Sequence, residues 1–193
     1  SALDLSIGRL EPHARTIGRE RLVAKSIAKN DKAALKTSMI STFNRVSATG
    51  ALTHLTFYDV DGNIFARFPE GAPGGDIPQI ARTAAETRKR ASSIIELEPG
   101  VMGGALAAPV LRGRNAIGSY VLGVSAIGQL PRIAEMMGEE AAYFQGETLS
   151  ARTENIPEIS NPAEIFSDNA RVSRFVAFNE GHQIATQLPM LDS

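Results

Sequence analysis

Two predicted β-hairpins constrain the fold of this chain more than any other feature of its sequence. Short β-type runs at Leu52–Asp59 and Ile64–Phe68 flank the pair Asp61 and Gly62, which readily supplies the positive φ of a tight turn. A second pair of apolar runs, at residues 105–111 and 116–125, flanks a polar turn that contains glycine and asparagine. Each pair of runs predicts two antiparallel neighbouring strands.

The segment between the hairpins predicts one helix and one short strand. Residues 77–90 have helical composition, with Ile80 and Ala84 one turn apart, and Ile94 with Ile95 then adds a short strand. The predicted order of elements is therefore β-β-α-β-β-β, an antiparallel sheet with a helical insertion.

The first 50 residues predict mostly helix. Apolar residues recur there at helical spacing and form one stripe: Leu3, Ile7, Leu10, Ala14, Ile17, Leu22, Ala24, Ile27, Ala28, Leu35, Met39, Phe43 and Val46. Asn30 and Asp31 are a predicted N-cap between two helical pieces, and Gly50 ends the second piece. Two interpretations fit the stripe: a helix packed on the sheet, or a helix emerging from a membrane that also pairs with its copy in a dimer.

A second, smaller unit is predicted after residue 138. A helix at Ile127–Met137 is followed by strand patterns at Ala141–Phe144, Val172–Phe178 and Gln183–Leu188. We expect an α+β protein with an N-terminal helical region (1–50), a sheet unit (51–138) and a smaller α/β unit (139–193). The last unit would gain a closing strand if the natural chain continued beyond Ser193, so we expect it to be truncated.

Composition excludes several classes of function. At 193 residues the chain fits one domain or two small ones, and its formal net charge of -1 gives no general attraction for nucleic acid. Cysteine is absent, so neither disulfides nor thiolate metal sites are possible. No run approaches the roughly 20 apolar residues of a membrane span. We therefore expect a soluble chain, with any receptor spans lying outside it.

Catalytic and metal motifs are missing from the sequence. His13, His54 and His182 form no metal-ligand spacing. Asp59 and Asp61 fit hairpin chemistry better than a calcium loop. The glycines at 71, 74 and 75 form no phosphate loop, and no serine lies in a nucleophile elbow. We expect neither a cofactor nor a metal, and we expect a protein that is not an enzyme.

The order of these features resembles the Cache sensor domains of bacterial transmembrane receptors, which are related to PAS domains. The resemblance rests on the N-terminal helices, the Asp-Gly hairpin and an arginine in its second strand. It also rests on Glu98-Pro-Gly100, the pair Pro109 and Val110, and the pair Ile117 and Gly118. It covers residues 51–137 well, and the continuation beyond residue 138 resembles double-Cache receptors.

The resemblance implies a function. It implies a periplasmic or otherwise extracytoplasmic ligand-binding domain of an inner-membrane receptor, such as a chemoreceptor, a sensor histidine kinase of a two-component system or a cyclic-dinucleotide enzyme. It also implies that a small metabolite binds on the curved sheet and that the receptor is a homodimer. The rival hypothesis is a module for dimerisation or for binding a partner protein, without a small ligand.

The same resemblance implies ligand-binding residues on three strands: Phe65, Arg67, Phe68, Ala105, Ala107 and Tyr120. A guanidinium at Arg67 can bind a carboxylate through two hydrogen bonds, although Arg67 could also simply face solvent. Strand alternation places Phe65 and Arg67 on one face, opposite Phe68, unless a bulge intervenes. Tyr120 suits either a pocket wall or a core.

One departure from the family pattern bears on the ligand. Citrate- and dicarboxylate-sensing relatives carry an arginine at the position matched by Ala105 and an aromatic residue near Ala107. Both residues are small and apolar here. The ligand is therefore expected to be less charged than a dicarboxylate, with a monocarboxylate as one candidate, or its charge is met by another residue. Small side chains also fit a bulkier, less polar ligand, or simple packing under a helix. A closed pocket lined by Arg67 or Tyr120 would favour the sensor, whereas a filled apolar core would favour the rival.

Overall fold

The computed structural model describes residues 2–72, 76–138, 140–145, 148–153, 173–179 and 182–190. Within it the chain divides into two compact units, one of Leu3–Ser125 and one of Ala126–Ser193 together with Ser1–Ala2. The boundaries predicted at residues 50 and 138 stay a prediction. Two of the glycines of the excluded phosphate loop, at 74 and 75, lie outside the described residues.

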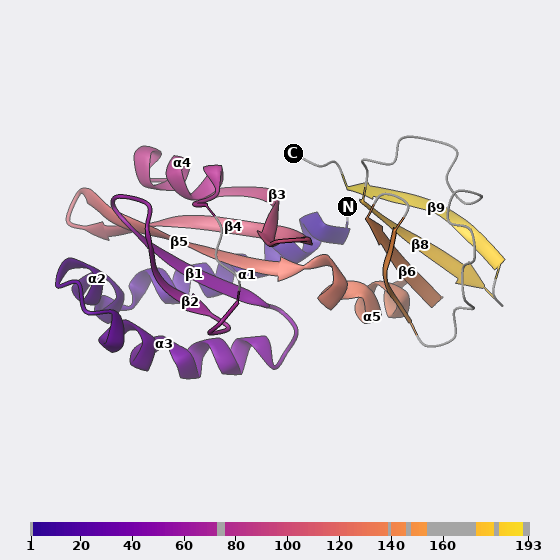
Figure 1. The fold of residues 1–193 in the computed structure, drawn as a ribbon, viewed down its shortest axis with the longest axis horizontal. Helices are drawn as coiled ribbons and strands as arrows, with labels where there is room; N and C mark the ends of the chain where they lie inside the picture. The colour runs from indigo at the N-terminus through magenta and orange to yellow at the C-terminus, as the bar shows by residue number, and fades with distance from the viewer. Residues whose placement is uncertain are drawn as a thin grey trace. The chain divides into compact units, whose positions relative to one another are not determined.

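The first unit contains an antiparallel sheet of five described strands in the order β2-β1-β5-β4-β3 (Figure 1). Their bounds are β1 His54–Asp59, β2 Ile64–Phe68, β3 Ala91–Glu98, β4 Val101–Arg112 and β5 Asn115–Ser125. Both predicted hairpins are present, since β1 pairs with β2 and β4 pairs with β5. The third strand is longer than the two isoleucines suggested, because seven of its eight residues, all except Leu97, pair along β4.

The first hairpin turn is held by one carboxylate. Asp59 Oδ1 accepts hydrogen bonds from the backbone amides of Asp61 at 3.0 Å and Asn63 at 2.9 Å. Gly62 has a φ of 85°, which only glycine adopts without strain. The predicted turn chemistry therefore accounts for Asp59 and Gly62, as the hairpin interpretation required.

Three helices cover one face of this sheet: α1 Ala2–Arg19, α2 Arg21–Ala28 and α3 Lys32–Ser47. The Asp31 side chain caps α3 by accepting a hydrogen bond from the backbone amide of Ala34 at 3.0 Å. Most of the predicted stripe is buried, but Leu22 is 44% exposed, and Val23 takes the inward position in its place. The break between α1 and α2 at Glu20 shifts the helical phase and explains this difference.

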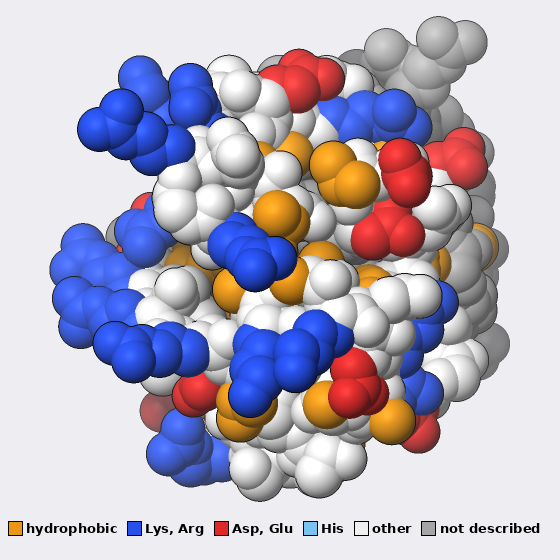
Figure 2. Space-filling model, turned by 90° about the vertical axis from the view of Figure 1, so that its left-hand side faces the viewer, with side chains coloured by type: hydrophobic (Ala, Val, Ile, Leu, Met, Phe, Trp, Pro, Cys, Tyr) orange, Lys and Arg blue, Asp and Glu red, His pale blue; other side chains and the backbone are white. Residues whose placement is uncertain are grey.

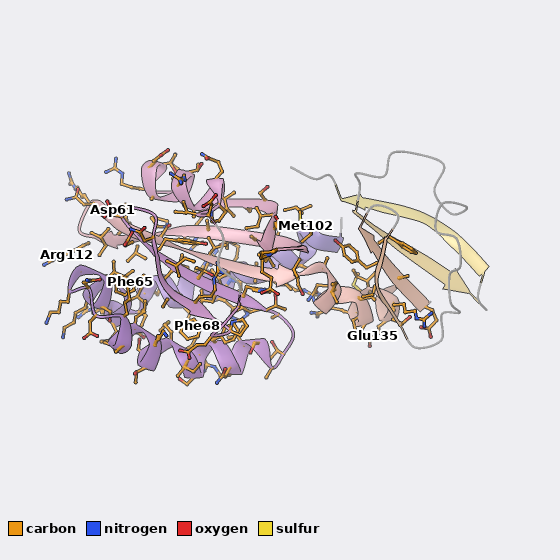
Figure 3. All side chains as sticks on the ribbon, viewed as in Figure 1. Asp61, Phe65, Phe68, Met102, Arg112 and Glu135 are labelled. Atoms are coloured by element: carbon orange, nitrogen blue, oxygen red, sulfur yellow. The ribbon has the colours of Figure 1, made fainter. Side chains whose placement is uncertain are left out.

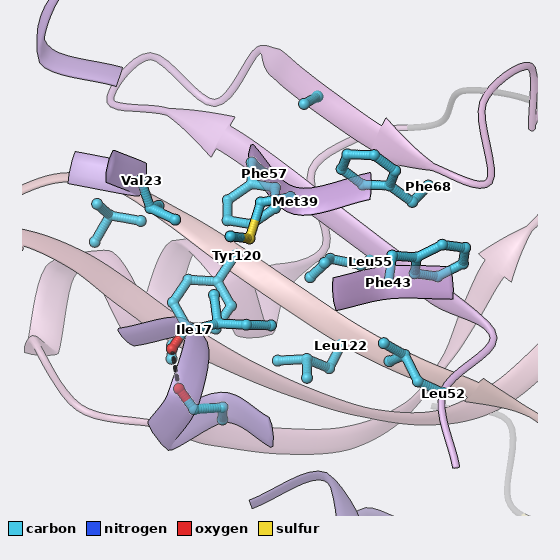
Figure 4. Packing of buried hydrophobic residues seen from close by; sticks show 14 of the residues in the cluster. Ile17, Val23, Met39, Phe43, Leu52, Leu55, Phe57, Phe68, Tyr120 and Leu122 are labelled. Carbon is cyan, nitrogen blue, oxygen red and sulfur yellow. Dashed lines mark hydrogen bonds between the residues drawn. The ribbon is translucent and has the colours of Figure 1, made fainter. Parts of the chain in front are cut away.

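The core beneath these helices combines residues from every N-terminal helix with the inward side chains of the sheet (Figure 4). The Phe43 and Phe68 rings lie 5.6 Å apart, and the Phe57 and Tyr120 rings lie 5.8 Å apart. Burial of these large rings supplies much of the driving force for packing the helices on the sheet. The predicted α+β class, with N-terminal helices on a PAS-like antiparallel sheet, is confirmed.

Helix α4 (Gln79–Thr87) covers the opposite face of the sheet. Its buried residues Ala81 and Ala84 pack with Ala105, Ala107 and Tyr58. Small residues on both sides allow the helix to approach the sheet closely.

The second unit contains α5 (Ala126–Met137) and four described strands in the order β7-β6-β8-β9. The strands are β6 Glu140–Gln145, β7 Thr148–Arg152, β8 Ser173–Asn179 and β9 His182–Met190, all paired antiparallel. Helix α5 packs against β6, whose residues 141–144 are buried. The smaller α/β unit predicted from the sequence is therefore present.

Candidate functional site

The candidate site is the face of the first sheet that α4 covers, called the α4 face below. Strand register defines its rows. In one row Arg67 lies opposite Thr56, and Thr56 lies opposite Val121, which in turn lies opposite Ala107. The neighbouring row contains Tyr58 and Ser119. Residues from four strands thus meet on one surface.

A polar group forms the centre of this face. Tyr58 is 3% exposed, and burial raises the pKa of its hydroxyl, while the charge of Arg67 and hydrogen bonds to Arg67 and Thr56 lower it. Ser119 is 1% exposed, and its Oγ has no hydrogen-bond partner within the described part of the chain. A buried hydroxyl without a partner costs free energy that a bound polar group would recover.

Small residues border the polar group. Ala105 and Ala107 are fully buried on this face. Leu97 packs so closely over Gly103 and Gly123 that a Cβ at either glycine would lie about 2.5 Å from its methyl groups. The face therefore combines one guanidinium and several hydroxyls with a small apolar wall.

His54 lies at the edge of the α4 face. Thr53 Oγ1 lies 3.2 Å from the carbonyl oxygen of Gly123 and 2.8 Å from His54 Nδ1, and the tautomer of the ring sets which atom donates in the second hydrogen bond. The other ring nitrogen, Nε2, lies 3.5 Å from Glu98 Oε2. Burial lowers the pKa of His54 below 6.5, Glu98 opposes this shift, and the charge of Arg67 adds to it.

This lowered pKa predicts a loss of stability on acidification. At pH values between 6.5 and the lower pKa of the folded state, His54 is largely protonated in the unfolded chain and largely neutral in the folded chain. The free energy of unfolding therefore falls as pH falls. Urea unfolding at pH 7.5 and about 5.5 measures the difference in the free energy of unfolding between the two pH values. This difference should be smaller in His54→Gln. The same measurement on His13→Gln gives the contribution of the second histidine, because burial and Arg45 lower the pKa of His13 as well. An unchanged difference in His54→Gln would contradict the prediction.

The structure divides the six predicted site residues between the two faces of the sheet. Arg67, Ala105 and Ala107 lie on the α4 face. Phe65, Phe68 and Tyr120 belong to the core under the N-terminal helices, and the two phenylalanines can be followed in Figure 3. The predicted set therefore does not form one cluster.

A β-bulge explains the placement of Phe65. Phe57 pairs with Ala66 and Tyr58 pairs with Ile64, so Phe65 is the extra residue of β2. Simple alternation would have placed Phe65 beside Arg67, but the bulge turns its ring to the helix side, where Lys32 Nζ lies 5.7 Å from the ring centroid. The expectation that Phe65 and Arg67 share a face was wrong for this reason.

Tyr120 is a core residue with one polar contact. Its ring is 2% exposed, and its hydroxyl donates a 2.7 Å hydrogen bond to the backbone carbonyl of Ala14 in α1 (Figure 4). Burial raises the pKa of Tyr120 to about 12, with Arg90 lowering it and Glu11 raising it by smaller amounts. Of the two interpretations of Tyr120, the core residue matches its packing.

Sequence reasoning missed Tyr58, Thr56 and His54. A signal for them was present, because they alternate with Leu55 and Phe57 along β1 and so share one face. The described residues contain no cluster of three or more histidine or acidic side chains that could hold a metal ion. That the six predicted site residues bind a ligand remains a prediction.

Comparison with known proteins identifies the class of fold. No protein-family model and no curated protein sequence matches the chain. Among solved structures, the sensor domain of the histidine kinase DctB from Vibrio cholerae aligns with a TM-score of 0.54 at 11% identity, covering 96% of this chain and 82% of that one. A domain of a sensory box/GGDEF family protein from Vibrio parahaemolyticus gives 0.54 at 13% identity, covering 91% and 83%.

These similarities show that the chain has the fold of sensor domains. They confirm the resemblance to Cache sensor domains at the level of the fold, and the DctB structure is that of a sensor domain. Among the described residues, no helix is both long and apolar enough to cross a membrane.

Proposed function

We propose that this chain is the extracytoplasmic ligand-binding sensor domain of a bacterial signal-transduction receptor. The observation that carries the proposal is the polar group of Arg67, Tyr58 and Ser119, which lies on a buried face of a sheet with the sensor-domain fold. The receptor would be a chemoreceptor, a sensor histidine kinase or a cyclic-dinucleotide enzyme, anchored by membrane spans outside this sequence and acting as a homodimer.

The proposed ligand is a small metabolite with one carboxylate. Arg67 is the cation of the polar group, and Ala105 and Ala107 add no further charge to the wall. Arg67 would bind the carboxylate, and the free Ser119 hydroxyl would bind a second polar atom of the ligand. Signalling requires a ligand that binds one arrangement of the terminal helices more tightly than the other.

A thermal-shift screen of small organic acids, amino acids, amines and purines tests the sensor function. A ligand that binds only the folded state raises the melting temperature in a saturable way. A saturable shift for any member of the panel would support the sensor and identify its chemical class. No shift with any compound would favour the rival, a dimerisation or partner-binding module, which the filled core around Tyr120 also fits.

Arg67→Ala is expected to weaken binding of a carboxylate ligand found in that screen by about 10- to 100-fold. A hydrogen bond to a charged group contributes about 1.5–3 kcal/mol, and each tenfold change in affinity corresponds to about 1.4 kcal/mol. Isothermal titration calorimetry measures the change. Arg9→Ala is the matched control, since Arg9 is an exposed arginine on α1, on the other side of the sheet. Unchanged affinity in Arg67→Ala would remove Arg67 from the site.

A further inference from the structure

A second surface of the first unit gathers positive charge in a groove of about 510 Å³. Arg15 and Arg19 reach it from α1, and Arg88 and Arg90 reach it from the segment between α4 and β3. Figure 2 looks onto the left-hand side of the view in Figure 1. It shows Lys and Arg side chains gathered there, with hydrophobic side chains visible between them.

The positive charge of the groove is largely uncompensated. Arg90 Nη1 lies 2.5 Å from Glu11 Oε2, which pairs one of the four arginines. Four guanidinium charges thus face one carboxylate, which leaves three in excess, although the formal net charge of the whole chain is -1. Within the described residues, Arg15, Arg19 and Arg88 form no ion pair with a carboxylate.

Two local features indicate that these arginines lower the stability of the elements that carry them. Arg15 and Arg19 lie four residues apart on α1, where like charges repel one another and weaken a helix. Arg88 is the C-cap of α4 with a φ of 57°, a left-handed conformation in which glycine or asparagine is usual. Its Nη1 donates to the carbonyl oxygen of Arg114 at 3.2 Å, so the side chain is anchored at the groove.

The floor of the groove is largely apolar. It contains Pro109, Leu111 and the buried Tyr120, whose hydroxyl is bonded to α1. A Cβ at Gly18 would lie 3.0 Å from that hydroxyl, so glycine allows α1 to run close to the floor. Guanidinium groups beside an apolar surface attract an anion more strongly than they would in bulk water.

We propose that this groove is a second binding site, which takes an oxyanion group carrying two or more negative charges, such as a phosphate ester or a polycarboxylate. Several guanidinium groups on two sides of the groove match the many acceptor oxygens of such a group. The site is separate from the α4 face, because its arginines do not include Arg67.

Calorimetric titration with inorganic pyrophosphate and with citrate, at constant ionic strength, tests the proposal. Acetate serves as the singly charged comparison. Saturable binding of pyrophosphate or citrate that is much tighter than that of acetate is expected. Absence of saturable binding of both probes at millimolar concentration would overturn the proposal.

Two variants test the site, and both should fold. Arg15→Ala combined with Arg19→Ala removes a repulsive pair from a helix, and Arg88→Gly places glycine in a left-handed C-cap. Each is expected to weaken pyrophosphate binding by about tenfold or more while the melting temperature stays the same or rises. Equal affinity in both variants and the parent protein would overturn the proposal.

Two controls separate this site from its surroundings. Arg82→Ala removes an exposed arginine of α4 that does not line the groove, so it should leave pyrophosphate binding within about twofold. Arg67→Ala should likewise retain pyrophosphate binding. The proposal for the groove and the proposal for the α4 face can therefore be tested independently. A loss of affinity in Arg82→Ala equal to that in Arg88→Gly would indicate general charge attraction and overturn the site.

Discussion

Replacing Phe57 with alanine is expected to lower the free energy of unfolding by about 3–5 kcal/mol, the range for truncating a buried phenylalanine. Phe57 is fully buried on β1, and its ring lies 5.8 Å from that of Tyr120. Truncation would leave a cavity between the sheet and the N-terminal helices, where both rings belong to one core. Urea unfolding followed by circular dichroism measures the loss.

Val60→Ala is the control for this prediction. Val60 lies in the turn after β1 and is 71% exposed, so its truncation should change stability by no more than about 0.5 kcal/mol. If Phe57→Ala cost less than about 1 kcal/mol, the core around Tyr120 would have to be far looser than its packing indicates.

Gly118→Ala is expected to lower stability by about 3 kcal/mol, at the upper end of the usual cost of overpacking. A Cβ at residue 118 would lie 2.3 Å from the backbone carbonyl oxygen of Tyr58, and backbone within a paired sheet has little room to move. Strands β1 and β5 would have to separate beside Tyr58 and Ser119. We therefore also expect the ligand response of the α4 face to weaken.

The matched control is Gly8→Ala, which should have the opposite sign. Gly8 lies inside α1, and a Cβ there would meet nothing within 4 Å. Alanine at an open helical position is expected to raise stability by about 0.5–1 kcal/mol. A similar loss of stability in both variants would contradict the close approach of β1 and β5 at Gly118.

The two faces of the sheet connect the proposed site to the N-terminal helices. Along β1, Thr56 and Tyr58 point to the α4 face, and Leu55 and Phe57 point into the core under α1 to α3. A ligand that binds Tyr58 and Arg67 would shift the same strand that contacts those helices. The sheet is therefore the element through which we propose that occupancy is relayed.

Local sequence determined the elements of this protein. The Asp-Gly turn, the apolar runs and the helical stripe depend on residues near one another in the chain, so they predicted both hairpins, the N-terminal helices and the Asp31 cap correctly. Arg67, Ala105 and Ala107 do lie on one face, as strand alternation and register allow. The family resemblance added the sensor-domain fold, which the similar structures confirm.

Only the tertiary structure decided how those elements combine into sites. One extra residue in β2 moved Phe65 to the opposite face from Arg67, because a bulge shifts all later pairing by one position. The arginine groove joins residues 15 and 19 to residues 88 and 90, which are about 70 positions apart in sequence. Periodicity reports only which way a side chain points along its own element, whereas a site depends on which elements the packing of the whole core brings together.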